Sequence, residues 1–482
     1  MSGIFQKSYF QIGILLILKL ILSLFFIRSF SIDLDEPFSI FYSQQSIPEL
    51  FTLFENENNP PLHFVLLHFW IEWFGISPAA VRSLSLIFGL FTIPLIYRAG
   101  QKTGGNTVGL IAGFFFVFSN FHFYHDLEAR PYPLLVFGYA LLILLLLKAN
   151  KEISVKNHLV TGLTLSALFY THYISPVIIA ATGCMFLYFA FTEREKKKRV
   201  QRITQLVLVL IPTVLITSAP ILRLLALRVS HVNETGTWVP AAQWTELYGQ
   251  INKFFNGKYV MIFLLLWGVF FLYEKRKFLT SLFTRLNFRH PATILSLFFL
   301  VTYLPLFGLS FFWHVHLFLD RYLFFLSLPL YLIVAYFFTS SSRTLRWTAL
   351  LPVFTFCLFF NPGKGNNRET DKIAEYLKTS KGSILISPPT FDLTLIYHYN
   401  PEWFQEMTHG KDLFPHNLFP VYSMQEIPDT NALIFPIQYL DADSKFGLGN
   451  EQLRKQLDEM YLPVDSNRFK GNYSVIRYEK KK

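Results

Sequence analysis

The sequence predicts a polytopic α-helical membrane protein of about eleven transmembrane helices, with interfacial helices in its first outer loop and a small C-terminal α/β domain. The chain of 482 residues is 52% hydrophobic and only 16% charged, and its mean hydropathy is +0.36, unlike an ordinary soluble domain. Apolar runs recur that can cross a hydrocarbon layer of ~30 Å, for which a helix needs about 20 largely apolar residues. Beyond residue 361 the composition becomes that of a soluble domain.

The clearest apolar runs are residues 13–30, 81–97, 134–147 and 322–338. The first lacks a small-residue cleavage site, so we expect a retained span rather than a removed signal peptide. The segment 62–74 is too short to span and contains His63, His68 and Glu72. Its apolar residues fall on one helical face, so we expect it to lie along the interface.

The basic residues between the spans predict the orientation. If segment 62–74 does not cross, all basic clusters fall on one side, which the positive-inside rule makes cytoplasmic. These clusters are Arg98/Lys102, Lys148/Lys151/Lys156, 194–202, 275–289 and Arg343/Arg346. The N-terminus is then cytoplasmic, and segments 31–80, 124–130, 171–173, 223–258 and 312–321 face outside. We expect the inner (plasma) membrane as the location.

The domain boundary is predicted near residue 361, where Asn361-Pro-Gly-Lys-Gly-Asn-Asn interrupts the apolar pattern. Residues 1–361 then form the transmembrane domain, and residues 362–482 form an extracytoplasmic α/β domain. Within the tail, periodicity predicts helices at 369–378 and 451–460. Short buried strands are predicted at 383–387, 432–435 and 473–478.

The charge and cysteine content exclude several classes of protein. The net charge is +11, but its Lys and Arg residues stand between apolar spans, which makes a nucleic-acid partner unexpected. Cys184 and Cys357 fall inside apolar runs, so they build neither a disulfide framework nor a thiolate metal site. His314 and His316 share no helical face. The sequence thus establishes no cofactor and gives no support for a divalent metal.

Three carboxyl groups, Asp33, Asp35 and Glu36, follow the first span. Pro37 and an amphipathic stretch come next, so the segment is expected to fold back onto the bilayer. A partly desolvated carboxylate with an acidic neighbour has a raised pKa, which suits a general base for an alcohol. The alternative is a hydrated loop start that only keeps the helix end in water.

Two arginines stand at the outer ends of spans and are candidates to bind phosphate. Arg130 lies within Glu128-Ala-Arg-Pro-Tyr132, and Arg321 precedes Tyr322. The alternatives are a Glu128–Arg130 ion pair that closes a loop and an Arg321 side chain that reaches the interface. Lys19, inside the first span, receives no role.

The order of these motifs resembles that of the C-type glycosyltransferase superfamily, in its bacterial family 39 branch related to protein O-mannosyltransferases and to the aminoarabinose transferase of lipid A. The matching segments are Asp35-Glu36, Asn59-Pro-Pro-Leu-His63, 66–75, Ala80-Val-Arg82, Glu128-Ala-Arg-Pro-Tyr132, Tyr170-Thr-His-Tyr173 and Arg321-Tyr322. The resemblance covers roughly residues 10 to 340, and Asn59 stands where the family often has His.

The resemblance implies an inverting transfer of a sugar from a polyprenyl-phosphate donor at the outer membrane face. Asp35 would be the catalytic base, Glu36 its partner and Asp33 a supporting residue. Donor phosphate would be held by Arg130 and Arg321, with Glu128 orienting Arg130. Expected substrate-binding residues are His63, Arg82, Tyr132, His172 and Tyr322.

The acceptor stays open between an envelope lipid, a glycan and a protein. Two alternatives also remain. One is the transfer of a whole lipid-linked oligosaccharide, and the other is a polytopic lipid or solute transporter, which would place charges at the bilayer midplane. A scaffold whose outer domain binds partners would leave the acidic and arginine motifs unexplained.

Overall fold

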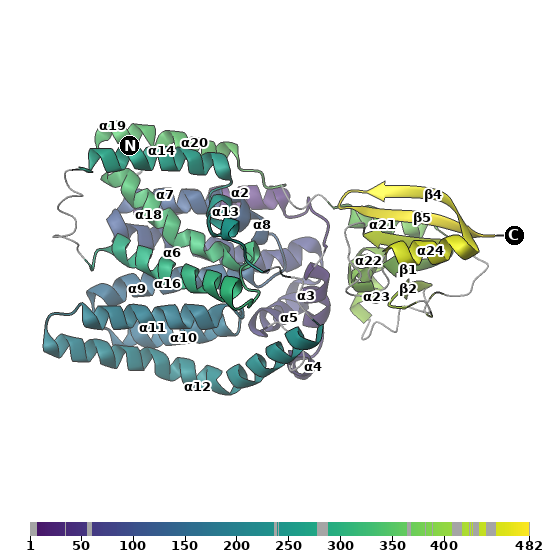
Figure 1. Ribbon diagram of the computed structural model, residues 1–482, viewed down its shortest axis with the longest axis horizontal. Coiled ribbons are helices and arrows are strands. Elements are labelled where there is room, and N and C mark those ends of the chain that lie inside the picture. Colours follow the sequence, from purple (N-terminus) through teal and green to yellow (C-terminus); the bar gives the residue numbers. More distant parts are fainter. Residues whose placement is uncertain are drawn as a thin grey trace. The chain divides into compact units, whose positions relative to one another are not determined.

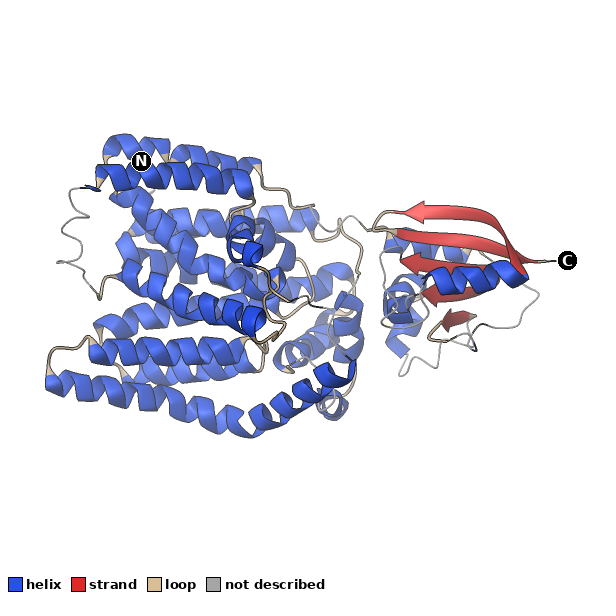
Figure 2. Cartoon of the chain, viewed as in Figure 1, coloured by secondary structure: helices blue, strands red, loops and turns tan. Residues whose placement is uncertain are grey.

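The computed structural model describes residues 7–33, 35–54, 60–235, 239, 241–276, 288–363, 368–380, 382–387, 389–406, 417–423, 425, 427, 433–439 and 450–481. Asn59 and residues 277–287, which the sequence analysis singled out, lie outside this set. Two compact units are present. The first comprises Met1–Phe25, Phe51–Leu66 and Arg82–Pro362, and the second comprises Phe26–Leu50, Leu67–Val81 and Gly363–Lys482. The described strands all lie beyond Pro362 (Figure 2).

The helices before Pro362 are labelled in Figure 1. In chain order they are α2 (Ser8–Phe26), α3 (Asp35–Ser43), α4 (Ile47–Phe54), α5 (Leu62–Phe74), α6 (Pro78–Gly104), α7 (Asn106–Val117), α8 (Asn120–His125), α9 (Tyr132–Lys151), α10 (Val155–Phe169), α11 (Ser175–Phe191), α12 (Lys196–Thr235), α13 (Trp244–Phe254), α14 (Lys258–Glu274), α16 (Pro291–Phe312), α17 (Asp320–Leu323), the 3₁₀ helix η1 (Phe324–Leu326), α18 (Ser327–Ser340), α19 (Arg343–Thr348) and α20 (Leu350–Leu358).

Among the described residues, six helical segments are long and apolar enough to cross a membrane. A seventh is added if α13 and α14, bent by 89° at a short break, form one span. Helices α5, α7 and α11 are apolar but shorter. The chain is therefore a multi-span helical membrane protein, while the count of about eleven spans stays a prediction.

Helices α6 and α7 approach closely because glycines face each other between them. A Cβ on Gly100 would stand 2.4 Å from the Cα of Gly109, and one on Gly109 would stand 2.5 Å from the Tyr97 carbonyl oxygen. Either contact is too short for a real side chain. Small residues that let two backbones approach are a common means of packing helices in lipid, where burial from water provides no driving force.

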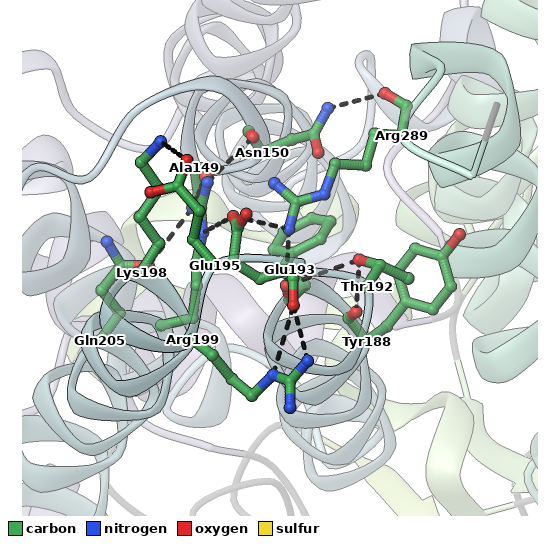
Figure 3. Close-up of polar contacts among 12 residues, drawn as sticks. Ala149, Asn150, Tyr188, Thr192, Glu193, Glu195, Lys198, Arg199, Gln205 and Arg289 are labelled. Carbon is green, nitrogen blue, oxygen red and sulfur yellow. Dashed lines mark hydrogen bonds and ion pairs between the residues drawn. The ribbon is translucent and has the colours of Figure 1, made fainter.

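A cluster of charged and amide side chains ties together one end of α9, α11 and α12 (Figure 3). The Arg202 guanidinium donates hydrogen bonds to the carbonyls of Ala149 and Asn150 in the last turn of α9. Glu193, just after α11, lies 3.1 Å from the Arg289 guanidinium and 3.9 Å from that of Arg202. Carbonyls at a helix C-terminus have no partner within their helix, so these arginines satisfy them.

The C-terminal part is a five-stranded mixed sheet in the order β2-β1-β3-β5-β4. Its strands are β1 (Gly382–Ser387), β2 (Leu418–Pro420), β3 (Leu433–Tyr439), β4 (Tyr461–Phe469) and β5 (Tyr473–Lys480), and its helices are α21 (Thr370–Lys378), α22 (Asp392–Tyr399), α23 (Pro401–Glu406) and α24 (Asn450–Met460), with the 3₁₀ helix η2 (Pro389–Phe391). Strand β1 pairs in parallel with β2 and β3, whereas β5 runs antiparallel to β3 and to β4.

The tail elements expected from the sequence coincide with α21, β1, β3, α24 and β5, and β3 extends four residues further than expected, to Tyr439. Position 432, where that strand was expected to begin, lies outside the described residues. The expected set omits β2, β4, α22 and α23.

Candidate active site

The three predicted acidic residues belong to the second compact unit and differ in exposure. Asp35 begins α3, so Asp35 and Glu36 both lie in its first turn, where the helix dipole favours carboxylates. Glu36 is 3% exposed and Asp33 is 5% exposed, whereas Asp35 is half-buried. A hydrated loop start does not bury two of three carboxylates, so that alternative does not describe this segment.

Asp33 is bound by two residues from the C-terminal part of the chain. Its Oδ2 atom lies 3.2 Å from the Arg368 guanidinium. The Tyr473 hydroxyl donates to Oδ1 at 3.4 Å. Two such partners compensate a carboxylate that burial removes from water. Of the three acidic residues, Asp35 therefore offers the most accessible carboxylate for chemistry.

The predicted donor and substrate residues of the first unit meet around two tyrosines. The Arg130 guanidinium lies 5.8 Å from the ring centroid of Tyr132, and that of Arg321 lies 5.7 Å from the ring of Tyr322. The two tyrosine rings are 6.5 Å apart, and the His172 ring lies 5.9 Å from Tyr132 and 4.9 Å from Tyr322. Three separate segments of the chain thus supply one basic aromatic cluster, defined as Arg130, Tyr132, His172, Arg321 and Tyr322.

Local structure explains how this cluster is held. Pro131 is the N-cap residue of α9 with φ near −69°, so Tyr132 lies in the first turn and Arg130 precedes the cap. The Ser85 hydroxyl donates to the Arg130 carbonyl oxygen at 3.4 Å, which ties this loop to α6. Arg130 is only 8% exposed. A cation against an aromatic face in such a position is stabilised by the ring quadrupole.

Glu128 has a partner that the sequence did not indicate. Its Oε2 atom lies 2.6 Å from Nδ1 of His125, three residues earlier. The His125 ring lies 5.0 Å from Tyr132. The predicted role of Glu128 in orienting Arg130 stays a prediction, and its observed contact connects it to the same aromatic cluster through His125.

The other predicted substrate residues, His63 and Arg82, are both almost fully buried in the first unit. Burial, together with the smaller effect of the neighbouring Arg130 charge, lowers the pKa of His63 to about 3, so this imidazole is neutral. The Leu62 amide beside it donates to the Tyr170 carbonyl oxygen at 2.9 Å, which ties the start of α5 to the turn before His172.

A buried ion pair joins α2 to the loop after α8. Lys19 and Asp126 are 2.7 Å apart and almost completely buried, and the Lys19 ammonium also lies 4.8 Å from the Phe123 ring centroid. Gly89 makes room for the pair, since a Cβ there would stand 2.5 Å from the Asp126 carboxylate. No role for Lys19 is predicted from the sequence, although a lone cation in an apolar span indicates such a partner.

Among the residues that the structure describes, no three His, Cys, Asp or Glu side chains are grouped as metal ligands would be. The acidic residues and the basic aromatic cluster are organic groups suited to proton transfer and to anion binding.

Part of the chain is similar to a known protein family. Residues 58–222 match the family model described as dolichyl-phosphate-mannose-protein mannosyltransferase. That segment contains six of the predicted site residues, namely His63, Arg82, Glu128, Arg130, Tyr132 and His172. No curated protein matches the chain.

Solved structures share the fold over nearly the whole chain. The crystal structure of ArnT from Cupriavidus metallidurans in the apo state matches with a TM-score of 0.55 and 12% identity, over 96% of this chain and 97% of ArnT. The structure of the same enzyme bound to undecaprenyl phosphate matches with a TM-score of 0.57, 12% identity and the same coverage.

The shared architecture defines the fold class of the chain, which is the multi-span helical membrane fold of ArnT. The chain is similar to ArnT in fold and, in residues 58–222, to the family of dolichyl-phosphate-mannose-protein mannosyltransferases.

Proposed function

We propose that the protein transfers a sugar from a polyprenyl-phosphate carrier to an acceptor of the cell envelope at the outer face of the membrane, with inversion at the anomeric carbon. The proposal extends to this chain the binding of undecaprenyl phosphate that the structure of ArnT contains.

The observation that carries the proposal is the basic aromatic cluster. Arg130 and Arg321 come from segments almost two hundred residues apart in the sequence, yet each lies against a tyrosine and the two tyrosine rings are 6.5 Å apart. Two fixed guanidinium groups beside apolar spans suit a phosphate whose lipid chain is dissolved in the bilayer. Aromatic rings such as those of Tyr132 and Tyr322 also suit the face of a sugar.

In the proposed reaction Asp35 accepts the proton of an acceptor hydroxyl while the hydroxyl oxygen attacks the anomeric carbon. The bond between that carbon and the phosphate oxygen breaks, and its electron pair leaves with the polyprenyl phosphate. Arg130 and Arg321 stabilise the negative charge that develops on the leaving group. A single displacement of this kind inverts the anomeric configuration.

The remaining predicted residues assist these steps. Glu36 is the acidic partner of Asp35 in the first turn of α3, and Asp33 supports the acidic segment through its contact with Arg368. Glu128 acts through His125, whose ring lies beside Tyr132. The neutral His63 and the buried Arg82 line the substrate site, and His172 completes its aromatic wall.

The proposed orientation places the N-terminus in the cytoplasm and the acidic residues and C-terminal domain outside an inner (plasma) membrane. The cluster around Arg202 supports this orientation, because it joins residues from three of the basic segments predicted to be cytoplasmic. In this topology the chain crosses the membrane about eleven times, and residues 1–361 and 362–482 form its two domains.

The acceptor is an envelope lipid, glycan or protein, and a host lacking the protein reveals which. We expect one class of envelope molecule in that host to lose the mass of a sugar in a mass-spectrometric comparison of lipids, glycans and glycoproteins. A loss of many sugars at once would instead indicate transfer of an oligosaccharide. An unchanged profile would contradict the proposal and favour a transporter.

The catalytic base is tested by Asp35→Asn, reintroduced into that host. We expect transfer to fall by about 10³-fold or more, because general-base catalysis and substrate orientation are both lost. Asp465→Asn, which changes an exposed carboxylate of β4 in the same compact unit, is the matched control and should restore the sugar fully. Full transfer by Asp35→Asn with normal insertion would remove Asp35 from the mechanism.

A further inference from the structure

The backbone just before Asp35 is bound by residues that lie more than three hundred positions later in the chain. Within the second compact unit, the Ile32 carbonyl oxygen accepts hydrogen bonds from the His398 Nε2–H at 2.7 Å and from the Thr370 hydroxyl at 3.3 Å. The Ser31 hydroxyl donates to Asp371 Oδ1 at 2.6 Å. Because a carbonyl can only accept, His398 must carry its proton on Nε2 in this arrangement.

The next side chain, Asp33, is bound by the segment that links the membrane domain to the sheet. The contact of Arg368 with Asp33 at 3.2 Å buries a charge pair, in which the side chain of Arg368 is 19% exposed and that of Asp33 is 3% exposed. The Tyr473 hydroxyl from β5 reaches the same carboxylate. A buried ion pair of this kind specifies one arrangement, since either charge alone would be left uncompensated.

Arg368 is itself held by the turn between β4 and β5. Gly471 in this turn has φ of +92°, and a Cβ there would stand 2.7 Å from Cγ of Arg368. The neighbouring Glu369 amide donates to the Lys470 carbonyl oxygen at 3.2 Å, and the Lys470 amide donates to the Glu369 carboxylate at 3.0 Å. The turn thus provides both the space for the arginine stem and the backbone contacts that fix its position.

Helix α3, which Asp35 begins, is also held by this part of the chain. Helix α3 packs against α22. The ring of Phe41 lies 5.8 Å from that of Phe404 in α23, and Gln44 donates to the Phe404 carbonyl oxygen at 3.5 Å. The acidic segment is therefore bound on both sides of Asp35, by polar contacts before it and by packing after it.

We propose that the C-terminal domain is the platform that positions the acidic segment, and that Arg368 is the positioning residue that fixes Asp35 through Asp33. The inference rests on the proposed function, in which Asp35 is the base. A base acts only when its carboxylate lies within hydrogen-bonding distance of the acceptor hydroxyl, and a misplacement of about 1 Å can reduce the rate by ~10²-fold.

The test uses the full-length protein in detergent, with lipid extract from the host that lacks the protein as the source of donor and acceptor. Transfer is followed by the mass of the product. We expect Arg368→Ala to reduce kcat by ~10²-fold with the apparent KM for the donor lipid extract changed by less than about threefold, because donor-binding residues are untouched. Hydrogen exchange of residues 31–36 should become faster in the same variant.

Two further variants separate positioning from general damage to the fold. Arg368→Lys keeps the charge and should recover part of kcat, and the exchanged pair Asp33→Arg with Arg368→Asp should recover more than either single change. Arg477→Ala is the matched control, since it removes a half-buried arginine of the same sheet that pairs with Glu479, and it should leave kcat unchanged.

The outcomes separate this inference from the proposed function. If Asp35→Asn is inactive while Arg368→Ala keeps the wild-type kcat and slow exchange at residues 31–36, the positioning inference is wrong and the function stands. A loss of kcat in Arg368→Ala that neither Arg368→Lys nor the exchanged pair relieves would also overturn it. Full activity of Asp35→Asn would instead overturn the proposed function on which the inference rests.

Discussion

Arg321 and Arg130 each lie beside a tyrosine but differ in burial. The more exposed Arg321 is the better position to test the contribution of a guanidinium group to donor binding. Arg321 is half-buried beside Tyr322, whereas Arg130 is buried beside Tyr132 and His63. Arg321→Ala should therefore raise the apparent KM for the donor by about tenfold and leave that for the acceptor within about twofold, since a charge-assisted contact to phosphate contributes ~1.5–3 kcal/mol. Steady-state kinetics with each substrate varied in turn would measure this, and equal changes in both values would contradict it.

The Lys19–Asp126 pair predicts a large effect on stability. Lys19→Met removes the ammonium group and leaves the Asp126 carboxylate buried without a positively charged partner. This should lower the free energy of unfolding by ~3–5 kcal/mol. The double variant Lys19→Met with Asp126→Leu should recover most of this loss. Unfolding of the purified protein in detergent by heat or by denaturant would measure the change in the free energy of unfolding. An unchanged midpoint in the single variant would show that the pair does not stabilise the fold.

The sequence predicts some residues of the candidate site but not their long-range partners. Tyr132, His172 and Tyr322 were selected from a motif resemblance, and the structure brings their rings together. The partners of Asp33 could not be found in this way, because Arg368 and Tyr473 lie far along the chain and no local pattern connects them to the first loop. Long-range ion pairs depend on tertiary structure, which periodicity does not encode.

Helix α22 begins with an acidic residue whose charge is unfavourable in the fold. Burial raises the pKa of Asp392 from 3.8 to about 6, although the Leu393 amide donates to its Oδ1 atom at 2.6 Å. The contribution of this group to the free energy of unfolding is thus most favourable below pH ~4, where the carboxyl is neutral in both states. As the pH rises to about 6 this stability is lost, because the unfolded chain releases the proton more readily.

Asp392→Asn should therefore stabilise the C-terminal domain at pH 7–8 by up to ~3 kcal/mol and have little effect near pH 4. The amide oxygen of Asn can still accept from the Leu393 amide. Hydrogen exchange of β1 and β5 in the full-length protein, corrected for the intrinsic effect of pH, would measure the change. Asp465→Asn is the control, and equal effects of the two variants at pH 7 would contradict the prediction.

At the scale of elements, the predictions were most accurate where periodicity was strong. Helix α5 occupies Leu62–Phe74 as expected, and the apolar runs correspond to long helices. Strand β4 was not predicted because most of its residues are exposed, including Leu462 and Val464, so no alternation of buried and exposed positions marks it. It lies at the edge of the sheet, where only one neighbour constrains it.

For the whole molecule, the sequence predicted a helical membrane protein with a mixed C-terminal domain, but not how its loops divide between the two compact units. Residues 26–50 and 67–81 group with the C-terminal residues. A boundary read from composition cannot show this, because composition does not reveal which long-range contacts a segment makes.

The predicted orientation is tested by accessibility of single cysteines in cells. With Cys184 and Cys357 replaced by Ser, we expect Ser466→Cys, on the exposed strand β4, to react with a membrane-impermeant maleimide from outside intact cells. Lys197→Cys, exposed near the start of α12, should react only after the membrane is opened. The physical reason is that the basic segment 194–202 resists translocation across the membrane. Reaction of Lys197→Cys in intact cells would reverse the orientation and place Asp35 on the cytoplasmic side, where an outer-face sugar donor could not reach it.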